Sequence, residues 1–287
     1  MGGVELLVAA EARVGEGPVW DERLGVLWWV DITGRSIHRT EPATGVDATF
    51  EVGQEVGAIA LCESRQLVVA LQDGLATFDI DTGTVELVCP IDDKPGMRMN
   101  DGKVGPDGHF WVGRMAIDEQ AGAGSLLRFG VDGRASTVLD GVTLPNGLDW
   151  SPDGQAMYFI DTPTGSVDVL RLSKGGDSVV RRDPLARFAD GLPDGLTVDA
   201  EGCLWVGLWG GWAVERLDEH GRTLERLHLP CANVTSCAFG GPDLDQLFVT
   251  SACEGLSDAE RAAQPAAGGL FRSSPGVRGL PARRFAW

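Results

Sequence analysis

The sequence lacks the features that direct a chain into a membrane, onto nucleic acid or through a secretory pathway. No run of about 20 apolar residues is present, which excludes an ordinary transmembrane helix. The N-terminus has no basic region and carries Glu5 inside its short apolar run, so we expect no signal peptide. Lys and Arg number 24 against 42 Asp and Glu, a formal net charge of −18. This acidity argues against nucleic acid and anionic membranes as partners, and we expect a cytoplasmic protein.

Several catalytic and cofactor-binding signatures are also missing. There is no G-x-S-x-G elbow, no P-loop and no complete G-x-G-x-x-G motif. The four histidines show no ligand spacing, which disfavours a histidine-rich zinc site, and we expect each to be exposed: His38, His109, His220 and His228. The six cysteines form no C-x-x-C pair and are expected to be reduced core residues, with a disulfide left open: Cys62, Cys89, Cys203, Cys231, Cys237 and Cys253.

What the chain does contain is a repeated unit, an Asp/Gly turn followed by an apolar strand. The unit recurs six times, at intervals of roughly 40 to 48 residues, as in propeller blades. Short, evenly spaced strands with Gly and Asp turns fit the same architecture. We therefore predict an all-β, six-bladed β-propeller with about four antiparallel strands per blade, forming a single domain over residues 1–287. A strand near residues 5–10 is expected to close the ring by pairing with C-terminal strands.

One short helix is predicted against this background. Ser257 and Glu260 form a capping box that opens an Ala-rich segment reaching Gln264, and Pro265 ends it. We place this segment in a loop before the last strand, at residues 269–271.

Three similar motifs place one oxygen-bearing side chain each beside glycine, ahead of a predicted strand. They are Gly15-Glu16-Gly17-Pro18, Leu144-Pro145-Asn146-Gly147 and Leu192-Pro193-Asp194-Gly195. We interpret them as turns that aim Glu16, Asn146 and Asp194 at one end of the central channel, where a ring brings distant blades together. Two carboxylates and one amide suit a hard divalent cation with positions left open. Asn-Gly and Asp-Gly are also ordinary turns, and that alternative stays open here.

A second group of polar residues precedes the strand that holds Trp111. Arg98 and Asn100 stand close together in Met97-Arg98-Met99-Asn100-Asp101-Gly102-Lys103, and could hold carbonyl and hydroxyl oxygens of a polar ligand. Asp118 could accept hydrogen bonds from sugar hydroxyls. The alternatives are a solvated loop and a surface carboxylate. The Trp209-Gly-Gly-Trp212 segment could either floor a sugar pocket or fill a seam between blades.

These motifs, in this order and spacing, resemble the SMP-30/gluconolactonase/regucalcin-like family of bacterial-type sugar lactonases. The resemblance runs from about Ala10 to about Phe271. It rests on the following phrases: Gly15-Glu16-Gly17-Pro18-Val19-Trp20, Arg98-Met99-Asn100-Asp101-Gly102-Lys103, Pro145-Asn146-Gly147-Leu148, Pro193-Asp194-Gly195 and Leu204-Trp205-Val206-Gly207-Leu208-Trp209.

The resemblance implies a propeller that binds one divalent metal ion in its tunnel. It assigns Glu16, Asn146 and Asp194 as metal ligands, with Asp194 also the catalytic base. Arg98 and Asn100 are implied to contact the substrate, and an acidic position of the family falls on Asp118, where animal members have Glu. An oxygen-only site admits Ca, Zn, Mg, Mn or Fe(II).

The expected function is metal-dependent hydrolysis of a sugar lactone to the open aldonic acid. Gluconolactone, xylonolactone and arabinonolactone are all candidate substrates, and the oligomeric state stays open. Two alternatives remain. One is another metal-dependent hydrolase on the same scaffold, phosphotriesterase-like or a promiscuous lactonase. The other is a non-catalytic calcium-binding propeller.

Overall fold

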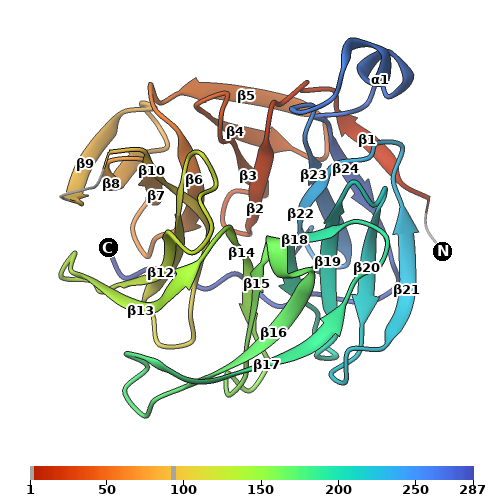
Figure 1. Cartoon of the computed structure of the whole chain (residues 1–287). Helices are drawn as coiled ribbons and strands as arrows, with labels where there is room; N and C mark the ends of the chain where they lie inside the picture. The colour runs from red at the N-terminus through yellow and green to blue at the C-terminus, as the bar shows by residue number, and fades with distance from the viewer. Residues whose placement is uncertain (1–2, 92–94) are drawn as a thin grey trace.

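The computed structural model describes residues 3–91 and 95–287 and confirms the six-bladed β-propeller. Six four-stranded antiparallel sheets surround a central axis (Figure 1). The first strand of each blade lies next to the axis and contacts the first strands of both neighbouring blades. These inner strands are β2 (Gly15–Asp21), β6 (Val56–Leu61), β10 (Met97–Val104), β14 (Pro145–Trp150), β18 (Leu192–Val198) and β22 (Val234–Gly240).

The remaining strands follow outward in chain order in every blade except the sixth, whose outer strand is the N-terminal β1. The second strands are β3 (Val26–Asp31), β7 (Gln66–Leu71), β11 (Phe110–Ala116), β15 (Met157–Asp161), β19 (Leu204–Trp209) and β23 (Gln246–Ser251). The third strands are β4 (Ser36–Glu41), β8 (Gly74–Asp79), β12 (Gly124–Phe129), β16 (Ser166–Leu172), β20 (Ala213–Leu217) and β24 (Leu270–Ser273). The outer strands are β5 (Val46–Glu51), β9 (Val85–Pro90), β13 (Ala135–Val142), β17 (Val179–Arg187), β21 (Thr223–His228) and β1 (Glu5–Val8).

The ring is closed by strands from both ends of the chain, as the sequence predicted. β1 pairs antiparallel with β24, so the sixth blade has the order β1-β24-β23-β22. The N-terminal strand thereby covers the free edge that the last C-terminal strand would otherwise expose.

The apolar core lies in the seams between neighbouring blades. The second strands are packed on both faces, which explains their unbroken apolar runs; every residue of β3 is buried. Aromatic pairs fill alternate seams, between the first and second, third and fourth, and fifth and sixth blades. Trp28 meets Phe78 at 5.9 Å between ring centres, Trp111 meets Trp150 at 5.8 Å, and Trp205 meets Phe239 at 5.8 Å.

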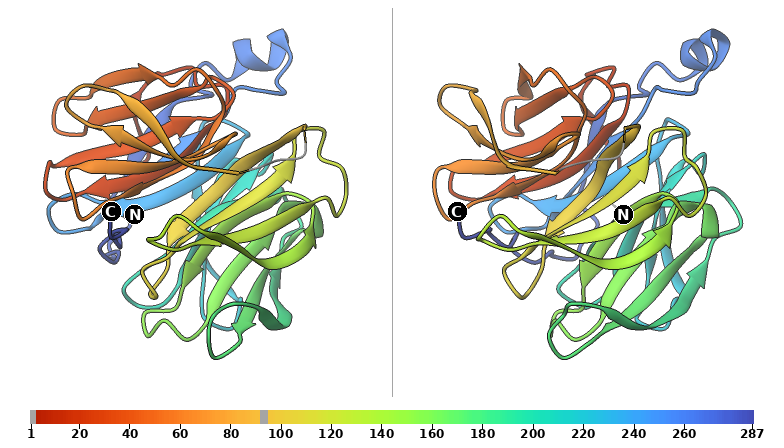
Figure 2. Two further views of the ribbon diagram at one scale, coloured as in Figure 1. Left: turned by 90° about the vertical axis from the view of Figure 1, so that its left-hand side faces the viewer. Right: turned by 60° about the vertical axis from the view of Figure 1, so that its left-hand side comes forward.

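The predicted helix is present as α1 (Asp258–Ala263), which projects beyond the ring of strands (Figure 2). Ser257 and Glu260 form the expected capping box, and Gln264 caps the C-terminal end. Across residues 3–91 and 95–287, the structure contains no helix with the length and apolar character needed to cross a bilayer.

Two predictions about single residue types have different outcomes. The six cysteines are free thiols, and all but Cys89 are buried. His38 is not exposed as predicted: its ring stacks on Trp29 at 3.9 Å and its Nδ1 lies 2.7 Å from Asp47 Oδ2. The Trp29 ring and the Asp47 carboxylate together compensate for the water that the His38 ring loses on burial. The prediction considered only metal-ligand spacing and not such partners.

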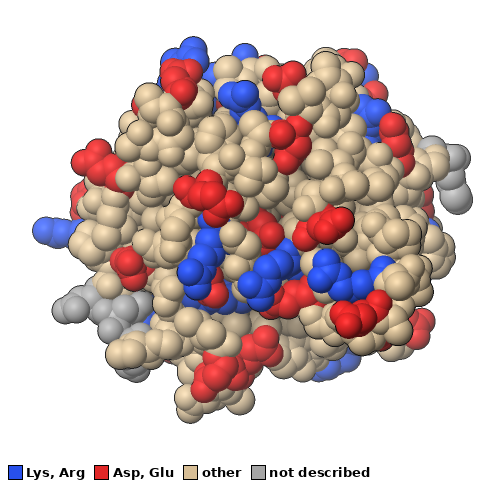
Figure 3. All heavy atoms as spheres, turned by 90° about the horizontal axis from the view of Figure 1, so that it is seen from above, with Lys and Arg blue, Asp and Glu red and all other residues tan. Residues whose placement is uncertain are grey.

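Charges on the outer face are mixed. On the side shown in Figure 3, lysine and arginine side chains are interspersed with aspartate and glutamate and do not form one basic patch.

The C-terminal strap (residues 277–287) crosses one end of the channel after the last strand (Figure 1). It begins against the fifth and sixth blades, where Gly279 N donates to Leu244 O at 2.8 Å. It ends against the second and third blades, where Phe285 N donates to Leu61 O at 2.8 Å. The Phe285 ring is fully buried and lies 6.4 Å from that of Phe110. The strap therefore connects opposite sides of the ring.

Candidate active site

Every inner strand carries a β-bulge near its start, and four of the six bulges hold or adjoin a predicted site residue. The pairing register slips between Met99 and Gly102, between Pro145 and Leu148, and between Pro193 and Leu196. Equivalent slips occur in β2, β6 and β22. Glu16, Asn100, Asn146 and Asp194 thus occupy one layer of the channel, which we call the ligand layer. An extra residue in a bulge redirects a side chain that regular pleating would send elsewhere.

Glu16 lies inside β2 and not ahead of a strand, contrary to the prediction. The Pro-Asn-Gly and Pro-Asp-Gly motifs are likewise not turns before strands, and that part of the prediction was wrong. They lie inside β14 and β18, and neither Gly147 nor Gly195 has a positive φ. Their glycines allow close approach of neighbouring inner strands. A Cβ on Gly147 would stand 2.7 Å from the backbone O of Asp194, and one on Gly195 would stand 2.2 Å from Ser236 Oγ.

A continuous series of hydrogen bonds, which we call the amide chain, links the third, fourth and fifth blades. Arg98 Nη1 donates to Asn100 Oδ1 at 2.6 Å, and Asn100 Nδ2 donates to Asn146 Oδ1 at 2.9 Å. Asn146 Nδ2 donates to Thr162 Oγ1 at 2.9 Å. Thr162 Oγ1 in turn donates to the Pro193 carbonyl at 2.9 Å, one residue before Asp194.

The amide chain fixes which atom Asn146 presents to the channel. Thr162 uses its single hydroxyl proton on Pro193, so its oxygen can only accept from the Asn146 nitrogen. The Asn146 oxygen is therefore turned toward the channel. It accepts one hydrogen bond from Asn100 and keeps a second lone pair available.

The two carboxylates in this layer are buried and repel one another. Glu16 is 4% exposed and Asp194 is 6% exposed. Burial, followed by the charges of Asp194 and Asp101, raises the pKa of Glu16 well above its usual value. Burial, followed by the charge of Asp101, likewise raises the pKa of Asp194, while the charge of Arg98 opposes both shifts. Two such groups have a strong electrostatic need for a cation between them.

The side chains present fit a divalent cation of the oxygen-binding kind. Within residues 3–91 and 95–287, no group of three or more His, Cys, Asp or Glu side chains is placed to hold a metal ion. A cation in this layer would therefore depend on the amide oxygen of Asn146 in addition to Glu16 and Asp194. Hard cations such as Ca²⁺ and Mg²⁺ accept mixed carboxylate and amide oxygen sets.

Arg98 is held on one side of the layer by groups from two blades. Its Nη1 donates to the Met99 carbonyl at 2.9 Å and to Asn100, and its Nε lies 3.7 Å from Glu55 Oε2. Burial lowers the pKa of the guanidinium, and the charges of Glu55 and Glu119 are the largest opposing effects.

Asp118 lies apart from the amide chain. It is exposed in the loop between β11 and β12, where its Oδ1 accepts from the Gln120 backbone at 3.3 Å. It lines an open groove together with residues such as Met97 and Ile117. The neighbouring carboxylate, Glu119, is the one in this loop whose charge acts on Arg98.

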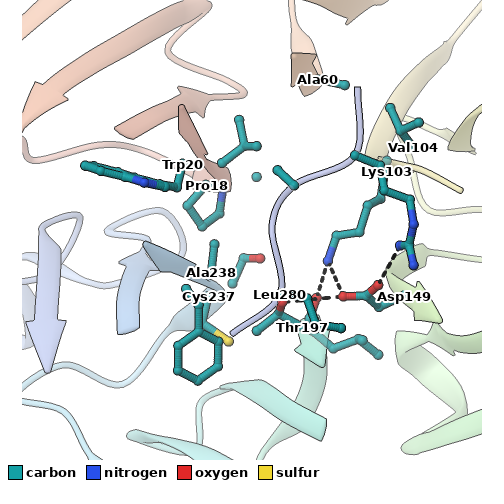
Figure 4. Close-up of a pocket in the computed structure, with 18 of the residues that line it drawn as sticks. Pro18, Trp20, Ala60, Lys103, Val104, Asp149, Thr197, Cys237, Ala238 and Leu280 are labelled. Atoms are coloured by element: carbon teal, nitrogen blue, oxygen red, sulfur yellow. Dashed lines mark hydrogen bonds and ion pairs between the residues drawn. The ribbon is translucent and has the colours of Figure 1, made fainter. Parts of the chain in front are cut away.

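A cavity of about 90 Å³ (Figure 4) is lined by inner-strand residues such as Lys103 and Thr197 and by strap residues such as Leu280. Lys103 Nζ donates to Asp149 Oδ2 at 2.8 Å and to the Leu196 carbonyl at 3.1 Å. Burial raises the pKa of Asp101, which also lines this cavity, to about 6 in spite of the opposing charge of Lys103. Strap residue Leu280 crosses this end of the channel in Figure 4, so the ligand layer lies on the side away from the strap.

Comparisons with known proteins identify the family of this chain. The model of a family described as SMP-30/Gluconolactonase/LRE-like region matches residues 14–253. The chain belongs to this family. The family predicted from the motifs is thus confirmed.

Members of the SMP-30/gluconolactonase family resemble this chain over nearly its whole length. Regucalcin of Xenopus laevis is 37% identical, and the match covers 99% of this chain and 98% of that protein. The putative sugar lactone lactonase YvrE of Bacillus subtilis is 35% identical, with 99% of both chains covered. The crystal structure of a calcium-binding protein, regucalcin, from Agrobacterium tumefaciens superposes with a TM-score of 0.93 at 31% identity, covering 98% of this chain and 97% of that one.

The sequence analysis did not identify three residues that line or support the channel of this protein. Thr162 stands at the start of the 3-10 turn after β15, with no motif that marks it as an amide partner. Glu55 precedes β6 in a stretch without proline or a neighbouring Asn-Gly pair. Asp101 was visible inside the Arg98–Lys103 motif, but it was interpreted only as a turn residue. It occupies the second position of the β10 bulge, equivalent to Gly147 and Gly195, so equivalence with Asn146 and Asp194 selects Asn100 and not Asp101.

Proposed function

We propose that this protein hydrolyses sugar lactones to the open aldonic acids with the help of one bound divalent cation. The observation that carries the proposal is the convergence of two buried carboxylates and one oriented amide oxygen in a single channel layer. The Bacillus subtilis relative, described as a putative sugar lactone lactonase, supports the substrate class, and the calcium-binding relative from Agrobacterium tumefaciens supports a divalent cation.

Glu16, Asn146 and Asp194 would hold the cation. When bound, a divalent cation supplies Lewis-acid polarisation of the lactone carbonyl. The protein's own contribution is preorganisation. The amide chain fixes the Asn146 oxygen, and the Gly17 backbone N–H donates to Glu16 Oε2 at 2.8 Å, which holds that carboxylate in place.

Asp194 acts as the general base in this proposal. It accepts a proton from the attacking water as the new bond to the lactone carbonyl carbon forms. The ring C–O bond then breaks, and Asp194 returns the proton to the departing ring oxygen, which becomes a hydroxyl of the open aldonic acid. Burial raises the pKa of this carboxyl above its usual value, which makes the carboxylate a stronger base. The charge of Arg98 opposes that shift and favours the ionised form that accepts the proton.

Arg98 and Asn100 position the substrate in different ways in this proposal. The Met99 and Asn100 contacts of Arg98 are made by Nη1, which leaves Nη2 suited to donate to sugar oxygens. Asn100 uses Nδ2 on the Pro145 carbonyl and on Asn146, so it reaches a substrate through Oδ1 alone. Its larger effect is to orient Asn146. A contact from Asp118 stays a prediction, because this residue lies on the exposed loop outside the amide chain.

A panel of substrates crossed with metal ions tests the proposal. The chelated protein is reconstituted with Ca²⁺, Zn²⁺, Mg²⁺, Mn²⁺ or Fe²⁺ and offered glucono-, xylono- and arabinonolactone, with acid release followed above the uncatalysed rate. We expect at least one lactone to be hydrolysed only in the reconstituted protein. Turnover of organophosphate triesters without lactones would instead indicate a phosphotriesterase-like enzyme. Cation binding without turnover of either class would indicate a calcium-binding propeller.

A further inference from the structure

The positive charge of Arg98 is paired inside the protein before any substrate arrives. Its Nε lies 3.7 Å from Glu55 Oε2, and the two side chains are only 14% and 16% exposed. Its Nη1 is occupied by the Met99 carbonyl and by Asn100. The guanidinium thus keeps hydrogen-bond donors for a ligand, while its charge is offset by a carboxylate in a partly buried setting where charges interact strongly.

The position of Glu55 is explained by its pairing with Arg98. It comes from the neighbouring blade, immediately before β6, where its backbone oxygen accepts from Gln72 N at 3.0 Å. In the part of the chain that the structure describes, Glu55 Oε2 is buried and accepts no hydrogen bond. A carboxylate oxygen that has lost water without gaining a donor is stabilised mainly by a nearby opposite charge. The pairing with Arg98 is therefore the feature that explains its position.

The charges of further carboxylates act on the same guanidinium. Glu119 and Glu254 both act on Arg98 through their charges, as does Glu16 in the ligand layer. Glu254 is held in place by hydrogen bonds from Arg13 Nε at 3.1 Å and Thr33 Oγ1 at 2.7 Å. An anionic substituent that reached Arg98 would meet a net negative environment, whereas a neutral hydroxyl would meet usable donors.

We propose that Glu55 makes this site selective for uncharged lactones, by pairing with Arg98 so that an anionic group on the substrate finds no free positive charge. The inference rests on the proposed lactonase function and specifies its substrate class. It assigns to Glu55 the role of a specificity and positioning residue, since it acts on the substrate through Arg98.

The test compares two lactones that share a ring and differ in one charged group. D-Glucono-1,5-lactone is neutral, and its 6-phosphorylated form carries a dianion. The ratio of kcat/KM for the neutral over the phosphorylated lactone is measured for the wild type, Glu55→Gln and Glu55→Asp, above the uncatalysed hydrolysis of each compound. Glu63→Gln is the matched control, because Glu63 is an exposed carboxylate that pairs with Arg23 at 3.3 Å.

We expect the wild type to prefer the neutral lactone and Glu55→Gln to reduce that preference by roughly tenfold, the effect of one unit charge acting across several ångströms in a partly buried site. Glu55→Asp and Glu63→Gln should keep the wild-type ratio, and added salt should narrow the difference between Gln and wild type. An unchanged ratio in a folded, active Glu55→Gln protein would overturn the inference, as would an equal loss of activity on both lactones. A wild type that hydrolyses neither of these lactones, nor xylono- or arabinonolactone, under any cation would instead refute the proposed function itself.

Discussion

Replacing Thr162 by Val tests whether the amide chain orients the Asn146 oxygen. The substitution keeps the shape of the side chain but removes a hydroxyl that accepts from Asn146 and donates to the Pro193 carbonyl. Thr162 is only 7% exposed, so water does not easily replace the lost partner. The amide of Asn146 then loses the acceptor that distinguishes its nitrogen from its oxygen.

The expected cost has a stability part and a functional part. Two buried polar groups lose a partner at about 1–3 kcal/mol each, so unfolding should become easier by about 2–6 kcal/mol. Loss of a supporting hydrogen bond behind a metal ligand typically lowers metal affinity or activity by about 10–100-fold. We expect the second effect even at temperatures where the variant is fully folded.

Chemical denaturation and cation titration measure the two parts separately. Thr162→Ser is the matched control, because it keeps the hydroxyl and loses one methyl group, and it should retain cation affinity close to wild type. A folded Thr162→Val protein that binds the cation and turns over lactone as the wild type does would refute the orientation argument.

Three further predictions follow from the packing and the charges. Gly195→Ala should destabilise the fold by about 1–3 kcal/mol or more, because its Cβ would stand 2.2 Å from the Ser236 hydroxyl oxygen, and an unchanged denaturation midpoint would contradict the close-packing argument. Because the pKa values of Glu16 and Asp194 are raised, the cation-free fold should lose stability as pH rises above the usual carboxylate range. The gain in melting temperature on adding a divalent cation should therefore be larger at pH 8 than at pH 5. A gain independent of pH would count against this coupling. Phe285→Ala should lower the unfolding free energy by about 3–5 kcal/mol, because this fully buried ring anchors the C-terminal strap, and a change under 1 kcal/mol in denaturation would show that the strap contributes little.

The blade pattern could be predicted from sequence because it depends on local chemistry repeated many times. An Asp/Gly turn followed by an apolar run marks five of the six second strands, while Glu63-Ser64-Arg65 precedes β7. The buried second strands such as β3 explain why those runs are unbroken. The pairing of β1 with β24 followed from the need to cover a free edge.

The geometry of the ligand layer was less accessible from sequence. Asn146 and Asp194 could be selected, but the bulges that aim them depend on pairing register, and proline and glycine alone suggest a turn equally well. The glycine requirement comes from strands of the next blade, as at Gly195 beside Ser236. Thr162 and Glu55 matter through partners far away in the sequence, and no local motif identifies such contacts.

Hydrolysis of a sugar lactone by Asp194→Asn is the most direct measurement of the central claim. The substitution keeps the size of the side chain and removes the base, and the protein is assayed with saturating divalent cation beside chelated and reconstituted wild type. We expect activity only in the reconstituted wild type, with the variant at least about 100-fold slower, the usual contribution of a positioned general base. A folded Asp194→Asn protein, or a chelated wild type, that hydrolysed the lactone at the full rate would contradict the account.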